Sequence, residues 1–188
     1  ACVGDEERSM GYIVIAHYGL ESGLVYKQGR ALRAQQKKLQ PLVLTLDLLP
    51  DVTVQELAVR LKPTKKQSLS NVWRKAGLDA AKASLVRELV AKEHWNHPEQ
   101  LAQQIKQLQI PLTGFRPIEE AISCAGGVRR KGLNPQLQLK SNPAVFLCGE
   151  MLDWDAPTGG YLLTACFATG RAAGEGVMQY LNVAKKSP

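Results

Sequence analysis

The stretch Gly149–Gly176, "GEMLDWDAPTGGYLLTACFATGRAAGEG", joins an acidic turn, a Gly-Gly pair and a long run of small and apolar residues. It continues from "AVFLCGE" (144–150), an apolar run of strand length that predicts a strand buried on both faces. A helix of about twenty residues is expected after the Gly-Gly pair. Within that helix, Gly170 and Gly174 are expected to let the helix pack close to a sheet. The stretch therefore predicts a strand, a loop and a helix of an α/β fold.

The pair Gly159 and Gly160 has two interpretations. In the first, a planar or anionic ligand approaches the N–H groups of the helix N-terminus, because glycines leave no side chain in the way. Glu150 and Asp153 then accept hydrogen bonds from ligand hydroxyls. In the second, the polar residues of the stretch only form turns and a helix cap. The residues in that interpretation are Asp153, Asp155 and Thr158. Spacing alone leaves both interpretations open.

The chain divides into three zones, which we predict as a β-rich segment (1–49), an inserted helical domain (50–111) and a mixed α/β zone (112–188). In the first zone, "GYIVIAHYGL" predicts a strand ending at Gly19, "LVYKQGRALRAQQKK" a short helix and "PLVLTLDLLP" a strand. The fold class expected for the whole chain is α/β, with α and β parts mixed.

The second zone contains several residues that typically begin or end helices. They are the Thr53/Glu56 capping box, the stop at Gly77, the cap at Asp79, Pro98 at a first helical position, and a helical stripe of Leu101, Ile105 and Leu108. Four short helices are therefore expected. The "HWNH" run (94–97) has an H-x-x-H spacing but lies in a polar loop, and we expect no metal site there or elsewhere in the chain.

Composition narrows the function classes. The 188-residue chain carries a formal net charge of +7, but aromatics are only 6% and no nucleic-acid-reading motif appears, so solvated basic faces are the favoured interpretation. No secretory signal occurs at the start, and the run Tyr161–Gly170 is about half the length of a membrane span. Cys2, Cys124, Cys148 and Cys166 are scattered and are expected to be buried thiols. We expect a cytoplasmic protein that binds neither membrane nor nucleic acid.

Three segments of the sequence resemble one known family. "ISCAGGV" (122–128), followed by "AVFLCGEMLDWDAPTGGYLLTACFATGRAAG" (144–174), closely resembles the C-terminal part of the HI0933-like flavoproteins. "GYIVIAHYGLESGLVY" (11–26) is similar to the family's "THYGxSGP" segment, and the helical zone is similar to its inserted helical domain. The resemblance extends over the whole chain. It implies an FAD-dependent oxidoreductase of the uncharacterised flavoprotein subgroup, with NAD(P)H as the expected co-substrate.

The resemblance also assigns residues to the FAD site. It places Gly149, Glu150 and Asp153 towards the ribityl and pyrophosphate region, with Thr158 in the same loop. It brings backbone N–H groups to the pyrimidine edge of the flavin, where a helix N-terminus stabilises the negative charge of the reduced ring. Those N–H groups belong to Gly159, Gly160, Tyr161 and Leu162. The segment that passes close to the ring, where a Cβ would clash, is Ala125, Gly126 and Gly127.

The chain departs from the family in two places. Ser22-Gly23-Leu24 stands where the family has "SGP", so the substrate side of the site differs, and the substrate is not predicted. No G-x-G-x-x-G segment for the ADP half is present. The chain is therefore expected to be the C-terminal portion of a longer flavoprotein, inactive and prone to self-association without its N-terminal Rossmann segment.

Catalytic groups are not identified from the sequence. His17 is the one candidate for a proton donor, against the alternative of a packed, hydrogen-bonded histidine. We do not expect a redox disulfide between Cys124 and Cys148. The rival hypothesis is a non-catalytic interaction module that uses the basic helical domain, in one version as a nucleic-acid-associated protein.

Overall fold

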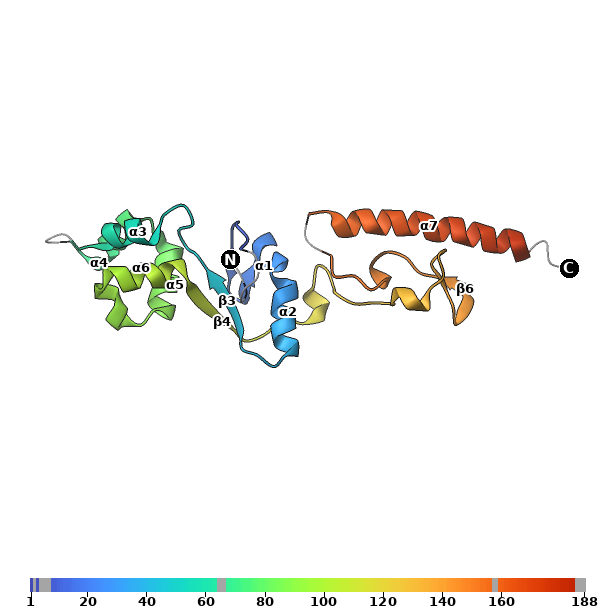
Figure 1. Cartoon of the computed structure of the whole chain (residues 1–188), viewed down its shortest axis with the longest axis horizontal. Helices are drawn as coiled ribbons and strands as arrows, with labels where there is room; N and C mark the ends of the chain where they lie inside the picture. The colour runs from blue at the N-terminus through green and yellow to red at the C-terminus, as the bar shows by residue number, and fades with distance from the viewer. Residues whose placement is uncertain (2, 4–7, 64–66, 157–158, 185–188) are drawn as a thin grey trace. The chain divides into compact units, whose positions relative to one another are not determined.

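The computed structural model describes residues 1, 3, 8–63, 67–156 and 159–184. The chain forms two compact units, Ala1–Gly114 and Phe115–Pro188. Figure 1 shows their helices and strands coloured along the chain. Each unit combines helices with short antiparallel strands, so the expected mixed α/β class is confirmed.

The first unit begins with a hairpin and two short helices. β1 (Val14–Ala16) pairs antiparallel with β2 (Gly19–Glu21), so the strand expected to end at Gly19 is two strands joined by a turn. The helix expected next is also divided, into α1 (Gly23–Lys27) and α2 (Gly29–Lys37). Gly29 has a low helix propensity, and the division falls directly before it.

A long ribbon follows. β3 (Leu42–Leu46), the strand expected between Pro41 and Pro50, pairs antiparallel with β4 (Leu108–Leu112). Leu42, Leu44 and Leu46 are buried on one face, as the period of two along a strand requires. The prediction that Leu108 continues a helical stripe is wrong, because α6 ends at Lys106 and Leu108 pairs with Leu46 in the ribbon.

In the sequence the helical segment falls between β3 and β4, and Figure 1 shows it at one end of the ribbon that these two strands form. It contains α3 (Val54–Leu61), α4 (Leu69–Ala76), α5 (Ala80–Leu89), the 3₁₀ turn η1 (Lys92–Asn96) and α6 (Pro98–Lys106). The local signals are confirmed. Thr53 and Glu56 form the capping box, Gly77 adopts a left-handed conformation after α4, Asp79 caps α5, and Pro98 opens α6.

One apolar core joins the ribbon to these helices. Trp73 packs edge-on against Trp95 with ring centroids 5.4 Å apart, and the guanidinium of Arg87 lies 5.3 Å from the Trp73 ring. The fully buried aliphatic side chains come from every helix of the segment and from both strands. They include Leu44, Leu57, Val86, Leu101, Ile105 and Leu108.

The second unit is smaller and built around one long helix. It contains the 3₁₀ turns η2 (Ile118–Glu120), η3 (Arg130–Gly132) and η4 (Gly149–Met151), the strands β5 (Gln138–Leu139) and β6 (Asn142–Phe146), and α7 (Tyr161–Ala184). The prediction that "AVFLCGE" is buried on both faces is wrong, because β6 is exposed over Asn142–Ala144 and half-buried at Val145 and Phe146. Its one strand partner is the two-residue β5, which leaves most of β6 uncovered within the described residues.

Among the residues that the structure describes, no helix is both long and apolar enough to cross a membrane. The thiols of Cys124, Cys148 and Cys166 are free. The expectation of burial is wrong for these three, because Cys124 is exposed and the other two are half-buried. Cys2 lies outside the described residues.

Candidate functional site

The two glycine-rich segments singled out in the sequence meet in the second unit. The Gly126 N–H donates to the Trp154 carbonyl at 2.8 Å, and the Val128 N–H donates to the Met151 carbonyl at 2.8 Å. The Asp153 N–H returns a bond to the Val128 carbonyl at 3.0 Å. Segment 126–128 and loop 149–154 therefore form one hydrogen-bonded layer, although they are more than twenty residues apart in the sequence.

Packing within the protein requires glycine at position 127. A Cβ on Gly127 would lie 2.5 Å from the Leu152 carbonyl oxygen and 2.7 Å from that of Met151. The expectation that a flavin ring excludes this Cβ is therefore not needed for Gly127, because the backbone of the loop already excludes it. At Gly126 the position is different, since its φ is +109° and a Cβ there would meet nothing within 4 Å.

Helix α7 forms the other wall of loop 149–154. The Gly149 N–H donates to Thr169 Oγ1 at 3.0 Å, and the Gly149 carbonyl accepts from Trp154 Nε1 at 2.6 Å. Gly149 has a φ of +65°, and a Cβ there would lie 3.6 Å from Cys166 Sγ on α7. The loop is thus held between segment 126–128 and the second and third turns of α7.

The N-terminus of α7 begins with the predicted Gly-Gly pair. Gly159 and Gly160 have φ values of +110° and +87°, a backbone conformation that residues other than glycine rarely adopt. A Cβ on Gly160 would meet nothing within 4 Å, and Tyr161 is 65% exposed. The Thr164 N–H donates to the Gly160 carbonyl at 3.0 Å, which is a helical hydrogen bond at the start of α7. The turn is therefore open to a ligand on its outer side.

The other predicted site residues lie near these segments in the chain. Glu150 and Asp153 are exposed on loop 149–154, so their carboxylates are accessible as acceptors for hydroxyl groups. Ala125 is exposed and precedes Gly126, and Leu162 is half-buried in the first turn of α7. Thr158 lies outside the described residues. Loop 149–154 and segment 126–128 are in contact, and the loop also contacts α7 through Thr169, eight residues after the start of the helix.

His17 belongs to the first unit, away from this site in the chain. It is exposed in the turn between β1 and β2, where its ring lies edge-on to Tyr18 with centroids 4.9 Å apart. Ser22, in the segment that departs from the family pattern, has a φ of 145° and caps α1 through a bond from the Val25 N–H at 3.4 Å. Neither arrangement assigns a catalytic role, so the role of His17 stays a prediction.

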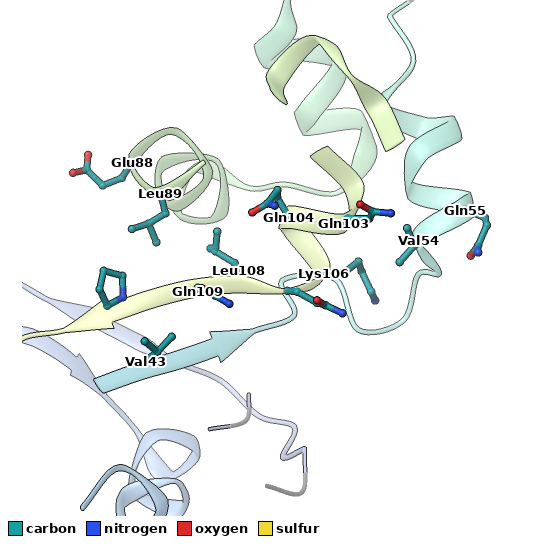
Figure 2. Close-up of a pocket in the computed structure, with 12 residues that line it drawn as sticks. Val43, Val54, Gln55, Glu88, Leu89, Gln103, Gln104, Lys106, Leu108 and Gln109 are labelled. Carbon is teal, nitrogen blue, oxygen red and sulfur yellow. The ribbon is translucent and has the colours of Figure 1, made fainter. Parts of the chain in front are cut away.

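A hydrophilic groove of about 960 Å³ lies elsewhere, in the first unit (Figure 2). Its walls come from the ribbon β3–β4 and the helices α3, α5 and α6. Glutamine amides dominate it, from Gln55, Gln103, Gln104, Gln107 and Gln109. Among the described residues that line it, the one cation is Lys106, which is held by Asp47 at 2.7 Å, so these residues offer no uncommitted positive charge to an anionic ligand. The glycine layer is the better candidate site.

Titratable clusters do not add a second site. Within the described part of the chain, no group of three or more His, Cys, Asp or Glu side chains is arranged to hold a metal ion. On α7, Arg171 Nε donates to Glu175 Oε1 at 2.9 Å, and this bond raises the pKa of Arg171 further above its ordinary value. Both side chains are exposed, so this ion pair lies on the surface of α7.

Thr169 and Trp154 are the site residues that sequence reasoning missed. Both lie inside the stretch 149–176, but their partner is Gly149, which is five residues from Trp154 and twenty from Thr169. A threonine inside a helix ordinarily bonds back to its own helix, so its type alone gave no indication of a loop partner. Only the folded loop shows that bond.

Comparison with known proteins shows the family of the chain. Residues 11–176 match the family described as "HI0933-like protein Rossmann domain". The chain belongs to that family, a class of Rossmann-type α/β proteins. It is also 29% identical over 130 residues to a 3-dehydro-bile acid delta(4,6)-reductase of Clostridium scindens. The alignment covers 69% of this chain but 30% of that reductase, so the chain spans under a third of the length of its relative.

Proposed function

We propose that this chain supplies the flavin-facing C-terminal part of an FAD-dependent oxidoreductase that uses NAD(P)H. The proposal is supported by the family membership over residues 11–176 and by the similarity to a reductase. Bound FAD would supply hydride transfer between NAD(P)H and an organic acceptor, whose identity we leave open.

One structural observation carries the proposal. Gly126 and Gly160 both have positive φ values, and a Cβ on either would meet no protein atom within 4 Å. Glycine is therefore not required there by internal packing, in contrast to Gly127. The positive φ values already favour glycine at both positions, and the open space beside each leaves room for a planar ring to approach the backbone. The residues present fit an isoalloxazine ring.

Each part of the layer has a chemical task under this proposal. The first turn of α7 directs N–H groups and the positive end of the helix dipole outward, which favours negative charge beside Gly160 and Tyr161. Glu150 and Asp153 are exposed acceptors for ribityl or ribose hydroxyls. Gly126 and Ala125 line the approach without bulky side chains. The chain thus binds and orients the cofactor, and no acid or base is assigned.

We further propose that the outer face of α7 packs against an N-terminal Rossmann segment of the same protein. Leu163, Phe167, Met178 and Leu181 are 48–72% exposed, although they recur at helical spacing on one face. Between them lie Gly170 and Gly174, where a Cβ would meet nothing within 4 Å. These two glycines therefore do not serve the close packing within the chain that we expected, and they leave room for a neighbour.

The test of the proposed function is the full-length protein encoded by the gene. We expect it to purify with the visible absorption of a flavin, and Gly160→Val to weaken FAD binding because the new side chain fills the open space. Thr53→Ala in the helical segment serves as a control that leaves the layer unchanged. A full-length protein that cannot be reconstituted with FAD would contradict the proposal.

A second candidate function rests on the helical segment. α4 and α5 are joined by the three-residue turn Gly77–Asp79, and Arg74 and Lys75 are exposed beside the turn. Exposed cations of this kind can contact nucleic-acid phosphates, so we propose to measure binding to duplex and single-stranded oligonucleotides. A sub-micromolar affinity with a steep salt dependence would support this function, and salt-independent or absent binding would exclude it.

A further inference from the structure

The two backbone polar groups of Gly149 are each bonded to a side chain. Its N–H donates to Thr169 Oγ1 at 3.0 Å, and its carbonyl accepts from Trp154 Nε1 at 2.6 Å. Thr169 Oγ1 also donates to the Ala165 carbonyl at 2.7 Å, one turn earlier in α7. A hydroxyl is the group that both accepts and donates at this point, so its two bonds connect the loop to the backbone of the helix.

This clamp has a geometric consequence for the proposed site. Gly149 has a φ of +65°, so the chain turns sharply there before Glu150 and Asp153. Thr169 is on the same helix whose first turn follows Gly159 and Gly160. A shift of α7 is therefore transmitted through Thr169 to the loop that carries the two carboxylates.

We propose that Thr169 and Trp154 are positioning residues of the cofactor site. They hold loop 149–154 in register with the N-terminus of α7, so that both halves of the site meet one bound FAD. The inference rests on the proposed function. It adds two residues that act on the loop through the backbone N–H and carbonyl of Gly149.

The experiment compares four variants of the full-length protein. Thr169→Val removes the hydroxyl at nearly constant volume, and Thr169→Ser restores it. Trp154→Phe removes the indole N–H and keeps an aromatic ring. Trp95→Phe is the matched control, because Trp95 belongs to the first unit and its Nε1 donates to the Val90 carbonyl at 3.0 Å within the helical segment.

Three measurements are made on each variant: the dissociation constant for FAD, the midpoint reduction potential and hydrogen exchange of the Gly149 amide. We expect Thr169→Val and Trp154→Phe to weaken FAD binding about tenfold, the effect of losing one hydrogen bond that orders a loop. The midpoint potential should shift with them, and Thr169→Val should lose protection of the Gly149 amide. Thr169→Ser and Trp95→Phe should behave as wild type in all three.

The outcomes separate the two claims. If wild-type protein binds FAD and the Gly149 amide loses protection in Thr169→Val while affinity and potential stay constant, the positioning role is overturned. If Thr169→Ser fails to rescue, the hydroxyl is not the acting group and the inference is also overturned. FAD binding by the wild-type protein tests the proposed function by itself. If the wild-type protein does not bind FAD, the proposed function is overturned.

Discussion

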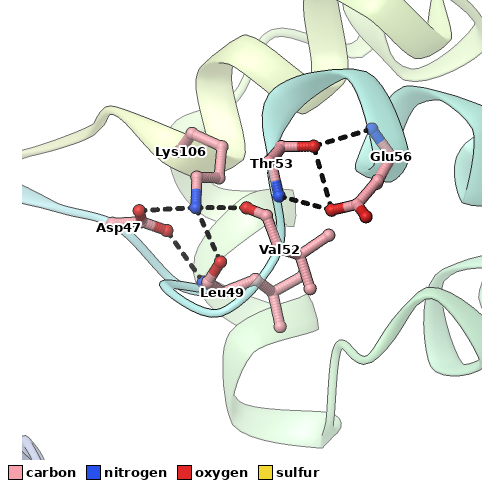
Figure 3. Close-up of polar contacts among 6 residues, drawn as sticks. All are labelled: Asp47, Leu49, Val52, Thr53, Glu56 and Lys106. Carbon is pink, nitrogen blue, oxygen red and sulfur yellow. Dashed lines mark hydrogen bonds and ion pairs between the residues drawn. The ribbon is translucent and has the colours of Figure 1, made fainter.

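Lys106 Nζ lies 2.7 Å from the Asp47 carboxylate, and the pair joins the two chain segments that lead into and out of the helical segment (Figure 3). The same ammonium donates to the carbonyls of Leu49 at 2.7 Å and Val52 at 2.6 Å. Its side chain is 12% exposed, so little water competes for these bonds. Three acceptors around one mostly buried cation fix the entry to α3 against the end of α6.

The first prediction concerns this cation. Lys106→Met keeps the length of the side chain but leaves Asp47 and two carbonyls without their donor. We expect the first unit to lose about 3 kcal/mol of unfolding free energy, as when one partner of a buried ion pair is removed. Denaturant unfolding followed by circular dichroism measures the loss. Lys62→Met is the control, since Lys62 and Glu99 are well exposed and 3.9 Å apart. Equal effects in both variants would contradict the role of burial.

The second prediction concerns the pH dependence of α3. The Thr53 N–H, and after it the Thr53 hydroxyl, donate to the Glu56 carboxylate at 2.9 Å and lower the pKa of Glu56. A lowered pKa in the folded state means that the stabilisation is present at neutral pH and is lost as the pH falls through that pKa. Glu56→Gln should therefore destabilise the protein near pH 7 and make little difference in acid. Unfolding titrations across pH test this, and a constant difference would contradict it.

The third prediction separates the two glycines of segment 126–128. Gly127→Ala places a Cβ 2.5 Å from a backbone carbonyl oxygen, and we expect a cost of about 2 kcal/mol or more because the loop cannot move aside freely. Gly126→Ala meets open space, so its cost should be limited to the backbone strain of about 1 kcal/mol. Thermal unfolding of the second unit measures both. If Gly126→Ala were the more damaging change in FAD-free protein, the assigned packing would be wrong.

The fourth prediction compares two glycines of α7. A Cβ on Gly176 would lie 2.7 Å from the Gln136 carbonyl oxygen, so Gly176→Ala should destabilise the second unit. Gly174→Ala meets nothing in this chain and should stabilise the helix by up to about 1 kcal/mol, the propensity difference between alanine and glycine. The same Gly174→Ala change in full-length protein should be unfavourable if a Rossmann segment covers that face. Melting temperatures of the two forms show the difference.

Local signals in the sequence were reliable because their physics is local. The capping box at Thr53, the left-handed Gly77 and the cap at Asp79 each depend on bonds that span three or four residues. The strand between Pro41 and Pro50 was predictable for the same reason, since its alternating burial follows from the strand repeat. Leu108 was misplaced because its helical spacing continues past Lys106, and spacing alone does not show where a strand partner ends the helix.

What the sequence by itself determined is therefore the mixed α/β class, the starts of α3, α5 and α6, the end of α4, and the family pattern of the glycine stretches. The tertiary structure decided which glycine serves which purpose. Gly127 is excluded from having a Cβ by Leu152, and Gly149 is held by Thr169 and Trp154. Contacts of this kind depend on distances between segments that only the folded backbone sets, and spacing along the chain carries no record of them.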